Sequence, residues 1–540
     1  MNSIIEKNDG QGLPIIAALS HYRLMSPLLL LLVACSPEPS APTPAVRVPA
    51  RVEVEAGSEC TPTGRGLVEQ VVEVPVGARA GLGVAVADFD DDGLLDVFVP
   101  NHHSNQLLMG SPWGLLKAPE RLTSTQFRSE SVSSVDYDSD GDVDIFLGTV
   151  SGSYLLINDG TGSFLDWKEV SDKASWTVGG TWGDINGDGG LDLLICNHAL
   201  NPPTQDQLNS NSLPGGDGSE LLLSDKKGGF VDVSDRIAAV DDLYPNTCLL
   251  QDLDNDQDLD LYMVNDYGPW SGPNRVLWND GKGFFTEDEG NSGLEVTVMG
   301  MGVAVASLDA SPVPSLLLSS WGEMKYIEAM EGGWVDSTAA RGFALGEQQQ
   351  VAWGVAMPDM DNDGDVDAAV TFGALFDVET EDYGLPNPDE QPDALFHQED
   401  GHFAQSAEVV LDDPSSGRGL VAADLDRNGS MDLIVHSLDD GTHIYFNDCP
   451  DQHWVTIRLE QQRGNRQAIG ARVELEAGGK TQVQWVHAGG TSMASSAPSE
   501  LHFGLGGAEK IDRIRVIWPN GDQSEVEAQP VDVLLRLSRD

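Results

Sequence analysis

The chain has 540 residues, enough for two or three domains that each bury a core. Its 87 acidic residues against 30 basic ones give a formal charge of -57, which disfavours nucleic acids and anionic lipid surfaces as partners. We therefore expect no nucleic-acid partner, whereas cations are favoured because the acidic residues occur in clusters.

The first residues resemble a bacterial export signal. Residues 28–34 form an apolar run far below the roughly 20 residues that a bilayer-spanning helix needs. The run leads through Leu-Val-Ala to Cys35, which resembles a lipobox whose cysteine is lipidated. We predict a signal segment over residues 1–35, with Met25 as an alternative start, and a Pro-rich tether over residues 36–60. The predicted location is the bacterial cell envelope as a lipoprotein, at the outer membrane or cell surface; an ordinary secretory signal and a secreted protein are the alternative.

Four further cysteines suggest disulfides in an exported protein. Three pairings are possible, and the sequence does not decide among them. We favour Cys60 with Cys449, since these flank the repeat region, and Cys196 with Cys248.

A nine-residue motif, Asp-x-Asp-x-Asp-Gly-x-x-Asp, recurs about every 56 residues. We call each copy an Asp loop and number its positions 1 to 9. The copies begin at Asp88, Asp136, Asp184, Asp252, Asp359 and Asp424, with an eroded copy at Ser307. Each lies between two short apolar runs that have no helical period, so it joins two strands.

A second turn signature follows most Asp loops, as in Asn158-Asp159-Gly160 and Asn279-Asp280-Gly281, and indicates a second hairpin. Two hairpins per repeat form a four-stranded unit that buries both faces only by stacking on its neighbours. The sequence therefore predicts an all-β fold with a seven-bladed β-propeller over residues 61–449. A β-sandwich array or a β-solenoid is the alternative.

The Asp loops have the composition of calcium sites. Side chains at positions 1, 3 and 5 converge as the backbone curls, Gly at position 6 permits the bend, and Asp at position 9 closes the cage. Neighbouring carboxylates about 4 Å apart repel by about 4 kcal/mol at an effective dielectric of ~20, so an empty loop would splay. We predict up to six calcium ions. The predicted ligands are Asp88, Asp90, Asp92 and Asp96; Asp136, Asp138, Asp140 and Asp144; Asp184, Asn186, Asp188 and Asp192; Asp252, Asp254, Asp256 and Asp260; Asp359, Asp361, Asp363 and Asp367; and Asp424, Asp426, Asn428 and Asp432.

An EF-hand is excluded, because it needs a Glu at position 12 and flanking helices, and position 12 here is Val99, Leu147 or Ile195 in a strand. The copies are not equivalent. Amides at Asn186 and Asn428 should weaken binding, and Gln257 takes the place of the bend glycine at some conformational cost. The eroded copy should bind nothing.

These loops resemble the FG-GAP/VCBS repeats known from integrin α-chain propellers, a resemblance that implies calcium-binding blades. The literal Phe-Gly and Gly-Ala-Pro elements are poorly kept, so no integrin-like ligand site is carried over.

Further on, Asn465-Arg466-Gln467, Gly489-Gly490, His502-Phe503-Gly504-Leu505-Gly506 and Trp518-Pro519-Asn520-Gly521 resemble the ASPIC/UnbV domain. The arrangement is similar to the bacterial branch of the cartilage acidic protein family, which implies secretion, calcium binding and an acidic surface.

We predict residues 450–540 to be a small β-sandwich, since apolar residues alternate with polar ones at 455–459, 473–475 and 514–518. The expected function is a surface binding, adhesion or scaffold module with structural calcium. Its partner would be a protein or glycan. Its only contact with a membrane would be the lipid anchor, and we expect it to be a monomer. His102-His103 and the insert 201–218 are candidate ligand contacts, although solvated loops explain them better.

The alternative is a carbohydrate-active or other enzyme with its site in the propeller channel or at the domain junction. No nucleophile elbow, zinc triad or phosphate loop supports it, and no catalytic residue is predicted. A channel lined by His, Arg and acids would favour the enzyme, and a plugged channel would disfavour it.

Overall fold

The computed structural model describes residues 46–57, 67–72, 81–111, 114–122, 127–344, 350–373, 391–407, 411, 416–438, 440–449 and 451–540. They belong to one compact unit, Ala45–Asp540. The predicted signal segment, Cys35 and Cys60 lie outside the described residues. Within those ranges no helix is long and apolar enough to cross a membrane.

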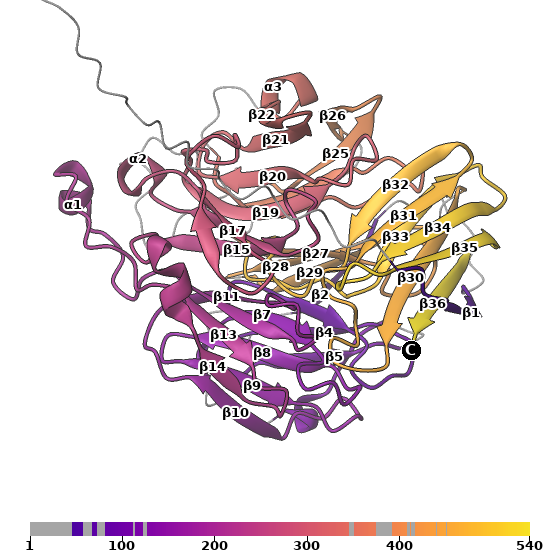
Figure 1. Cartoon of the computed structure of the whole chain (residues 1–540), viewed down its shortest axis with the longest axis horizontal. Helices are drawn as coiled ribbons and strands as arrows, with labels where there is room; N and C mark the ends of the chain where they lie inside the picture. Colours follow the sequence, from indigo (N-terminus) through magenta and orange to yellow (C-terminus); the bar gives the residue numbers. More distant parts are fainter. Residues whose placement is uncertain are drawn as a thin grey trace, which may run out of the picture. The chain divides into compact units, whose positions relative to one another are not determined.

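The described strands form nine four-stranded sheets, and seven of these come from the repeat region (Figure 1). We call the seven sheets blades 1 to 7 and number each Asp loop by its blade. Blade 1 contains β3 (Ala85–Ala87), β4 (Asp96–Val99), β5 (Gln106–Met109) and β6 (Leu116–Lys117). Blade 2 contains β7 (Ser129–Val135), β8 (Asp144–Thr149), β9 (Ser153–Ile157) and β10 (Asp166–Ser171). Blade 3 contains β11 (Thr177–Gly183), β12 (Asp192–Asn197), β13 (Glu220–Ser224) and β14 (Phe230–Asp232).

Blade 4 contains β15 (Pro245–Gln251), β16 (Asp260–Asn265), β17 (Arg275–Asn279) and β18 (Phe285–Glu287). Blade 5 contains β19 (Gly300–Ala306), β20 (Ser315–Ser320), β21 (Lys325–Met330) and β22 (Gly333–Asp336). Blade 6 contains β23 (Ala352–Ala356), β24 (Ala368–Phe372), β25 (Ala394–Glu399) and β26 (His402–Gln405). Blade 7 contains β27 (Gly417–Ala423), β28 (Asp432–Ser437), β29 (Thr442–Phe446) and β2 (Val68–Val72). Short helices lie in the connections: η1 (Pro119–Arg121), α1 (Gln205–Asn209), η2 (Ser234–Val240), α2 (Gly268–Ser271) and α3 (Thr338–Arg341).

The first strands of the blades are buried whether or not their residues are apolar. Every residue of β7 and β15 is buried, although β7 contains four serines and a glutamate, whereas the last strand of blade 2, β10, is largely exposed. Each pair of neighbouring blades shares its own apolar cluster, and the cluster of Val84, Val97, Val421 and Ile434 joins blade 7 to blade 1. The ring is closed by β2, a strand from before blade 1 that pairs with β29. The predicted all-β propeller fold is confirmed.

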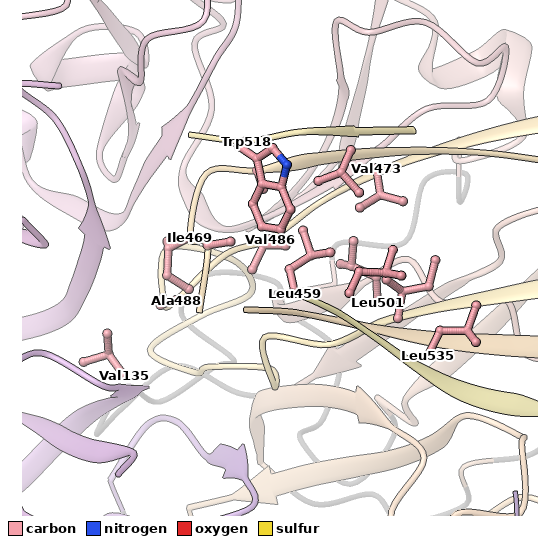
Figure 2. Packing of buried hydrophobic residues seen from close by; sticks show 14 of the residues in the cluster. Val135, Leu459, Ile469, Val473, Val486, Ala488, Leu501, Trp518 and Leu535 are labelled. Carbon is pink, nitrogen blue, oxygen red and sulfur yellow. The ribbon is translucent and has the colours of Figure 1, made fainter. Parts of the chain in front are cut away.

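The remaining two sheets form the C-terminal domain. Their orders are β1-β36-β30-β33 and β32-β31-β34-β35. The strands are β30 (His453–Gln461), β31 (Arg472–Ala477), β32 (Lys480–Trp485), β33 (Leu501–Gly506), β34 (Ile511–Ile517), β35 (Gln523–Gln529) and β36 (Val533–Arg539). The alternating residues at 455–459, 473–475 and 514–518 are all buried, and Leu459, Val473 and Trp518 meet in one core (Figure 2).

Part of the predicted tether belongs to this domain. β1 (Arg51–Ala56), which falls within residues 36–60, pairs antiparallel with β36 along six residue pairs. The backbone before it also binds the domain, since Val48 N donates to Gln523 O at 2.8 Å. Residues 51–56 are therefore a strand of the sheet β1-β36-β30-β33 and not part of an extended linker.

A loop of the C-terminal domain lies in the channel that the first strands of the blades surround. We call residues 488–496 the plug. Its main-chain bonds are Trp182 N to Ala488 O (3.0 Å), Ser492 N to Val303 O (2.7 Å), Val132 N to Ala494 O (3.2 Å), Val86 N to Ser496 O (3.0 Å) and Ser496 N to Val84 O (2.9 Å). Ser492 also accepts from Thr247 Oγ1 and, through Oγ, from Val355 N. Blade 7 approaches so closely that a Cβ on Gly419 would lie 2.8 Å from Ser495 Oγ. The plug therefore contacts all seven first strands.

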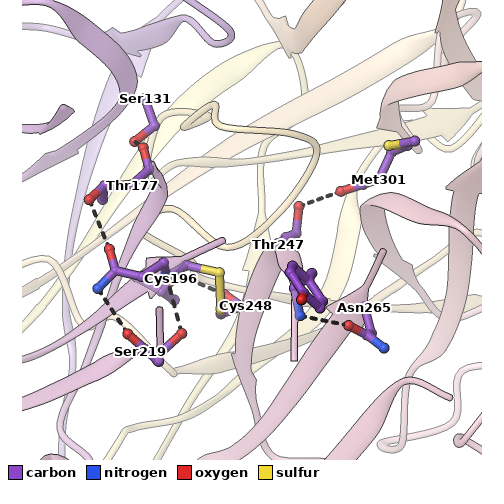
Figure 3. The surroundings of a disulfide bond; sticks show 12 residues. Ser131, Thr177, Cys196, Ser219, Thr247, Cys248, Asn265 and Met301 are labelled. Atoms are coloured by element: carbon purple, nitrogen blue, oxygen red, sulfur yellow. Dashed lines mark hydrogen bonds between the residues drawn. A yellow bond between two sulfur atoms is a disulfide. The ribbon is translucent and has the colours of Figure 1, made fainter. Parts of the chain in front are cut away.

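The disulfide between Cys196 and Cys248 is present, as predicted, and joins β12 of blade 3 to β15 of blade 4. Figure 3 shows it between two inter-blade hydrogen bonds, Ser131 Oγ to Thr177 O and Thr247 Oγ1 to Met301 O. Cys449 is also disulfide-bonded. Its predicted partner Cys60 lies outside the described residues.

Candidate metal centres

Five of the six Asp loops bring three carboxylates together. In each, the side chains at positions 1, 3 and 9 offer oxygen atoms that all lie within 4.8 Å of one another. The groups are Asp88, Asp90 and Asp96; Asp136, Asp138 and Asp144; Asp252, Asp254 and Asp260; Asp359, Asp361 and Asp367; and Asp424, Asp426 and Asp432. Hard oxygen donors at this density are the ligands that Ca²⁺ prefers. Several Asp-rich groups of this protein are thus suited to a metal ion.

Position 1 nucleates the curl of the loop. Its Oδ2 accepts a hydrogen bond from the main-chain N–H of position 6 in all six loops, at 2.9 to 3.2 Å. Position 6 has a positive φ throughout, including φ 78° at Gln257, where the sequence predicted a strained non-glycine residue. The bend and the first carboxylate therefore fix each other.

Position 5 serves as a turn acceptor in every loop. Its Oδ1 accepts from the N–H of position 7 at 2.7 to 3.1 Å, the geometry of an Asx turn. The predicted ligands at this position, Asp92, Asp140, Asp188, Asp256, Asp363 and Asn428, stand outside the three-carboxylate groups. One oxygen of each side chain is thus committed to the loop itself.

Position 9 ties the loop to the third strand of its blade. Its Oδ1 accepts from a main-chain N–H at the end of that strand in all six blades, at 2.6 to 3.0 Å. The eroded loop keeps this bond without a charge, because Ser315 Oγ accepts from Ala329 N at 3.1 Å. Position 9 therefore has a structural role that is separable from any metal.

The clusters are costly in ionised form because they are buried. Burial raises the pKa of Asp136 to about 7, that of Asp359 to about 8 and those of Asp144 and Asp260 to about 9, with neighbouring carboxylates adding to the effect. The pKa of Asp432 is raised for the same reason. A bound cation would remove this penalty by stabilising the charged form.

Some of the buried carboxylate oxygens lack any hydrogen-bond donor. Among the predicted ligands these are Oδ1 of Asp90, Oδ1 of Asp136, Oδ2 of Asp144 and Oδ1 of Asp359. Asp136 and Asp144 belong to the same three-carboxylate group, and the Asp136 side chain is only 3% exposed. Buried oxygens without a donor are rare in folded proteins unless water or an ion completes them. The donor set therefore fits a hard cation.

Loop 3 differs from the others. Among the residues that the structure describes, Asp184, Asp188 and Asp192 do not form a three-carboxylate group, because Asn186 occupies position 3. Its backbone bonds are nevertheless the same, with Gly189 N donating to Asp184 Oδ2 at 2.9 Å. Loop 3 therefore keeps the backbone hydrogen bonds of the other loops but has one carboxylate fewer.

The C-terminal domain lies against the Asp loops, and the motifs that carry its family resemblance make the contacts. Gln467 Oε1 accepts from Asp136 N at 2.7 Å, Asn465 N donates to Gly189 O at 3.1 Å, His502 Nε2 hydrogen-bonds Asn362 Oδ1 at 2.7 Å, and Arg472 donates to Asn255 Oδ1 at 2.6 Å. Arg458 lies 3.7 Å from Asp88 and Arg466 lies 3.8 Å from Asp136. Cationic side chains thus reach acidic loops across the junction.

Position 4 is a part of this contact that sequence reasoning missed. It has a positive φ in all six loops, at Asp91, Ser139, Gly187, Asn255, Asn362 and Arg427. Asn255 and Asn362 bind the C-terminal domain directly, and Arg427 pairs with Glu500. The signal available in the sequence was the frequency of Asn and Gly at this position, since these residues favour a left-handed backbone.

One predicted loop residue lies elsewhere than expected. His102 is buried, with Nε2 2.8 Å from Glu130 Oε1, so its assignment to a solvated loop was wrong. His103 is exposed. The insert 201–218 contains α1 and connects β12 to β13, on the opposite ends of these strands from loop 3.

Comparison with protein families identifies two segments of the chain. Residues 461–540 match the ASPIC and UnbV family, and residues 136–195 match the FG-GAP-like repeat. The chain contains both modules. Both resemblances expected from the sequence are therefore confirmed, and the FG-GAP-like match spans loops 2 and 3. We refer to residues 461–540 with their flanking strands as the ASPIC and UnbV domain.

Among curated proteins, no sequence matches this chain. An Agrocybe aegerita lectin, solved for its recognition of non-reducing terminal N-acetylglucosamine, is 14% identical over 68% of this chain and 90% of its own, with a TM-score of 0.41. The exotype rhamnogalacturonan lyase YesX is 12% identical over 74% of this chain and 76% of its own, with a TM-score of 0.37. At these scores neither likeness carries an argument about function.

Proposed function

We propose that this chain is an exported calcium-binding propeller in which the ions stabilise the fold, and that it acts as a binding, adhesion or scaffold module. The observation that carries the proposal is the set of buried carboxylates at positions 1, 3 and 9, several of whose oxygens have no donor. Calcium bound there would be held by these carboxylates and would supply positive charge, with no chemical transformation required.

A stabilising role follows from where the loops lie. Each connects the first two strands of its blade, and together they support the ASPIC and UnbV domain. An ion in a loop therefore stabilises both the blade and the junction. At a free calcium concentration ten times Kd, one site contributes about 1.4 kcal/mol, so several sites would contribute much of a domain's stability.

A non-enzymatic role is supported by the channel. The plug hydrogen-bonds to the first strands of the blades and occupies part of the channel that they surround. The partner we propose is a protein or glycan that binds loops outside the junction. We also propose that the protein is exported as an envelope lipoprotein with its lipid on Cys35, and that it is a monomer. Mass spectrometry of the mature N-terminus tests for the lipid.

Calcium titration of chelator-treated protein tests the proposed function. The comparison is a variant in which position 3 of the five groups is changed to the amide that loop 3 already carries: Asp90→Asn, Asp138→Asn, Asp254→Asn, Asp361→Asn and Asp426→Asn. Asp159→Asn, in an exposed turn, is the matched control. We expect up to six ions in the wild type and in the control, and several fewer in the fivefold variant. Equal calcium binding by all three proteins would refute the assignment.

A further inference from the structure

Three asparagines of the second hairpin turn reach the Asp loop of the preceding blade. Nδ2 of Asn158, in blade 2, donates to the main-chain carbonyl of Phe89, in loop 1, at 2.8 Å. The two equivalent bonds, each 2.8 Å long, run from Asn279 to Ile185 of loop 3 and from Asn447 to Met360 of loop 6. In all three the acceptor is position 2 of the loop.

Position 2 is consequently held from both sides. Its N–H donates to Oδ2 of the position 9 aspartate in its own loop, as from Phe89 to Asp96 at 2.8 Å, and its carbonyl is held by the next blade. Loops 3 and 6 repeat the pattern, with 3.0 Å from Ile185 to Asp192 and 3.0 Å from Met360 to Asp367. Because position 2 separates the carboxylates at positions 1 and 3, this clamp fixes their relative orientation.

The same asparagines are bound to the Asp loops of their own blades. Asn158 N donates to Oδ1 of Asp144 at 2.8 Å, and its side chain also donates to Val143 O at 2.9 Å. The corresponding main-chain bonds run from Asn279 to Asp260 at 3.0 Å and from Asn447 to Asp432 at 2.8 Å. Each asparagine thus connects two Asp loops that belong to neighbouring blades.

The other blades lack this connection. The residues at the same place are Gly110, Ser224, Ala329 and Gln398, identified by the main-chain bond to position 9. In the described part of the chain, none of their side chains hydrogen-bonds to the preceding Asp loop. Through these asparagines the six loops form three pairs: loops 1 and 2, loops 3 and 4, and loops 6 and 7. Loops 7 and 1 are joined in another way, since Arg427 Nε, at position 4 of loop 7, donates to Gly93 O, at position 6 of loop 1, at 2.9 Å.

We propose that Asn158, Asn279 and Asn447 couple the calcium affinities of the two loops in each pair. The inference rests on the proposed calcium function and adds to it a positioning role for these side chains. When one loop of a pair is occupied, its position 9 carboxylate is fixed, and the asparagine bonded to that carboxylate is fixed with it. The amide then holds position 2 of the other loop in its binding geometry, so that the second ion binds more tightly.

Loops 6 and 7 have a second connection. Asn362, at position 4 of loop 6, donates from Nδ2 to Gly429 O, at position 6 of loop 7, at 2.7 Å. This bond joins the two loops directly and does not pass through Asn447. Coupling in this pair should therefore survive loss of its asparagine better than coupling in the other two pairs.

Asn158→Ser tests the proposal, since blade 3 uses Ser224 at the same place, and Ser224→Ala is the matched control. Native mass spectrometry of the full chain over a series of free calcium concentrations counts the bound ions. In N158S we expect two ions to require at least about fivefold more calcium, with the remaining ions unchanged. In S224A all ions should titrate as in the wild type.

A double-mutant cycle separates coupling from simple loss of affinity. Asp138→Asn gives loop 2 the position 3 amide of loop 3 and weakens its ion, and in the wild-type background it should also weaken one further ion, the one in loop 1. In the N158S background, Asp138→Asn should leave the affinity of the ion in loop 1 unchanged. The proposal is overturned if the N158S and S224A titrations coincide, or if N158S weakens all sites equally. Asn279→Ser repeats the test in loops 3 and 4 should N158S fail to fold, and a wild type that binds no calcium refutes the proposed function itself.

Discussion

Truncation of Met493 in the plug tests whether this loop is a structural part of the propeller. The Met493 side chain is fully buried, in a cluster with Leu82, Met301 and Trp353 from three blades. Met→Ala at such a site removes the burial free energy of the side chain and leaves a cavity, at a cost of about 2–5 kcal/mol. Because the cluster spans several blades, little collapse is available to reduce that cost, and we expect a value in the upper half of the range.

The assay is urea unfolding at saturating calcium, followed by tryptophan fluorescence. Met330→Ala is the control, because Met330 lies at the end of β21 with 56% of its surface exposed, and it should change stability by less than about 0.5 kcal/mol. If M493A unfolds at the same urea concentration as M330A, burial of the Met493 side chain contributes nothing to the stability of the propeller, and the reasoning is refuted.

Three further predictions concern the loops and the disulfide. Asp254→Asn should weaken calcium binding at loop 4 and, through Asn279, at loop 3, without destabilising the calcium-free protein. Asp260→Asn should destabilise both forms by about 1–3 kcal/mol, because Asp260 accepts two main-chain N–H groups; denaturation with and without calcium distinguishes the two variants. Burial raises the pKa values of Asp88 to about 6, of Asp136 to about 7 and of Asp144 to about 9. The contribution of these three groups to the stability of the calcium-free protein is therefore greatest below pH 4, and it is lost as the pH rises through 6 to 9. The melting-temperature gain on adding calcium should therefore grow from pH 5 to pH 8, and a gain independent of pH would contradict this. Replacing Cys196 and Cys248 by Ser should cost about 4 kcal/mol, from the closure entropy of a loop with sequence separation 52, and unchanged thermal unfolding would exclude that contribution.

Local chemistry made much of the fold and site predictable. The Asp loops combine turn-forming residues with flanking apolar runs, and both signals are contained within about a dozen residues. The alternation at Val473 and Leu475 likewise identified a buried sheet face. The pairing of Cys196 with Cys248 was one of three that the sequence allowed, and only the structure decides it.

Long-range pairing was not predictable in the same way. β2 completes blade 7, and β1 joins the sheet of β36, yet each partner lies several hundred residues away in the chain. Val52 and Val54 do alternate with charged residues, a strand signal that the neighbouring prolines concealed. The position of the plug was harder still to predict, because its run of small residues indicates close packing but does not indicate which surface it packs against.

We propose that the Asp loops bind calcium and that the bound calcium stabilises the fold. The most direct measurement is the melting temperature of the full chain with and without EDTA, combined with a count of bound calcium in the same preparation. We expect several bound ions, at most six, and a substantial fall in melting temperature on chelation. An unchanged melting temperature together with fewer than about three ions would contradict it.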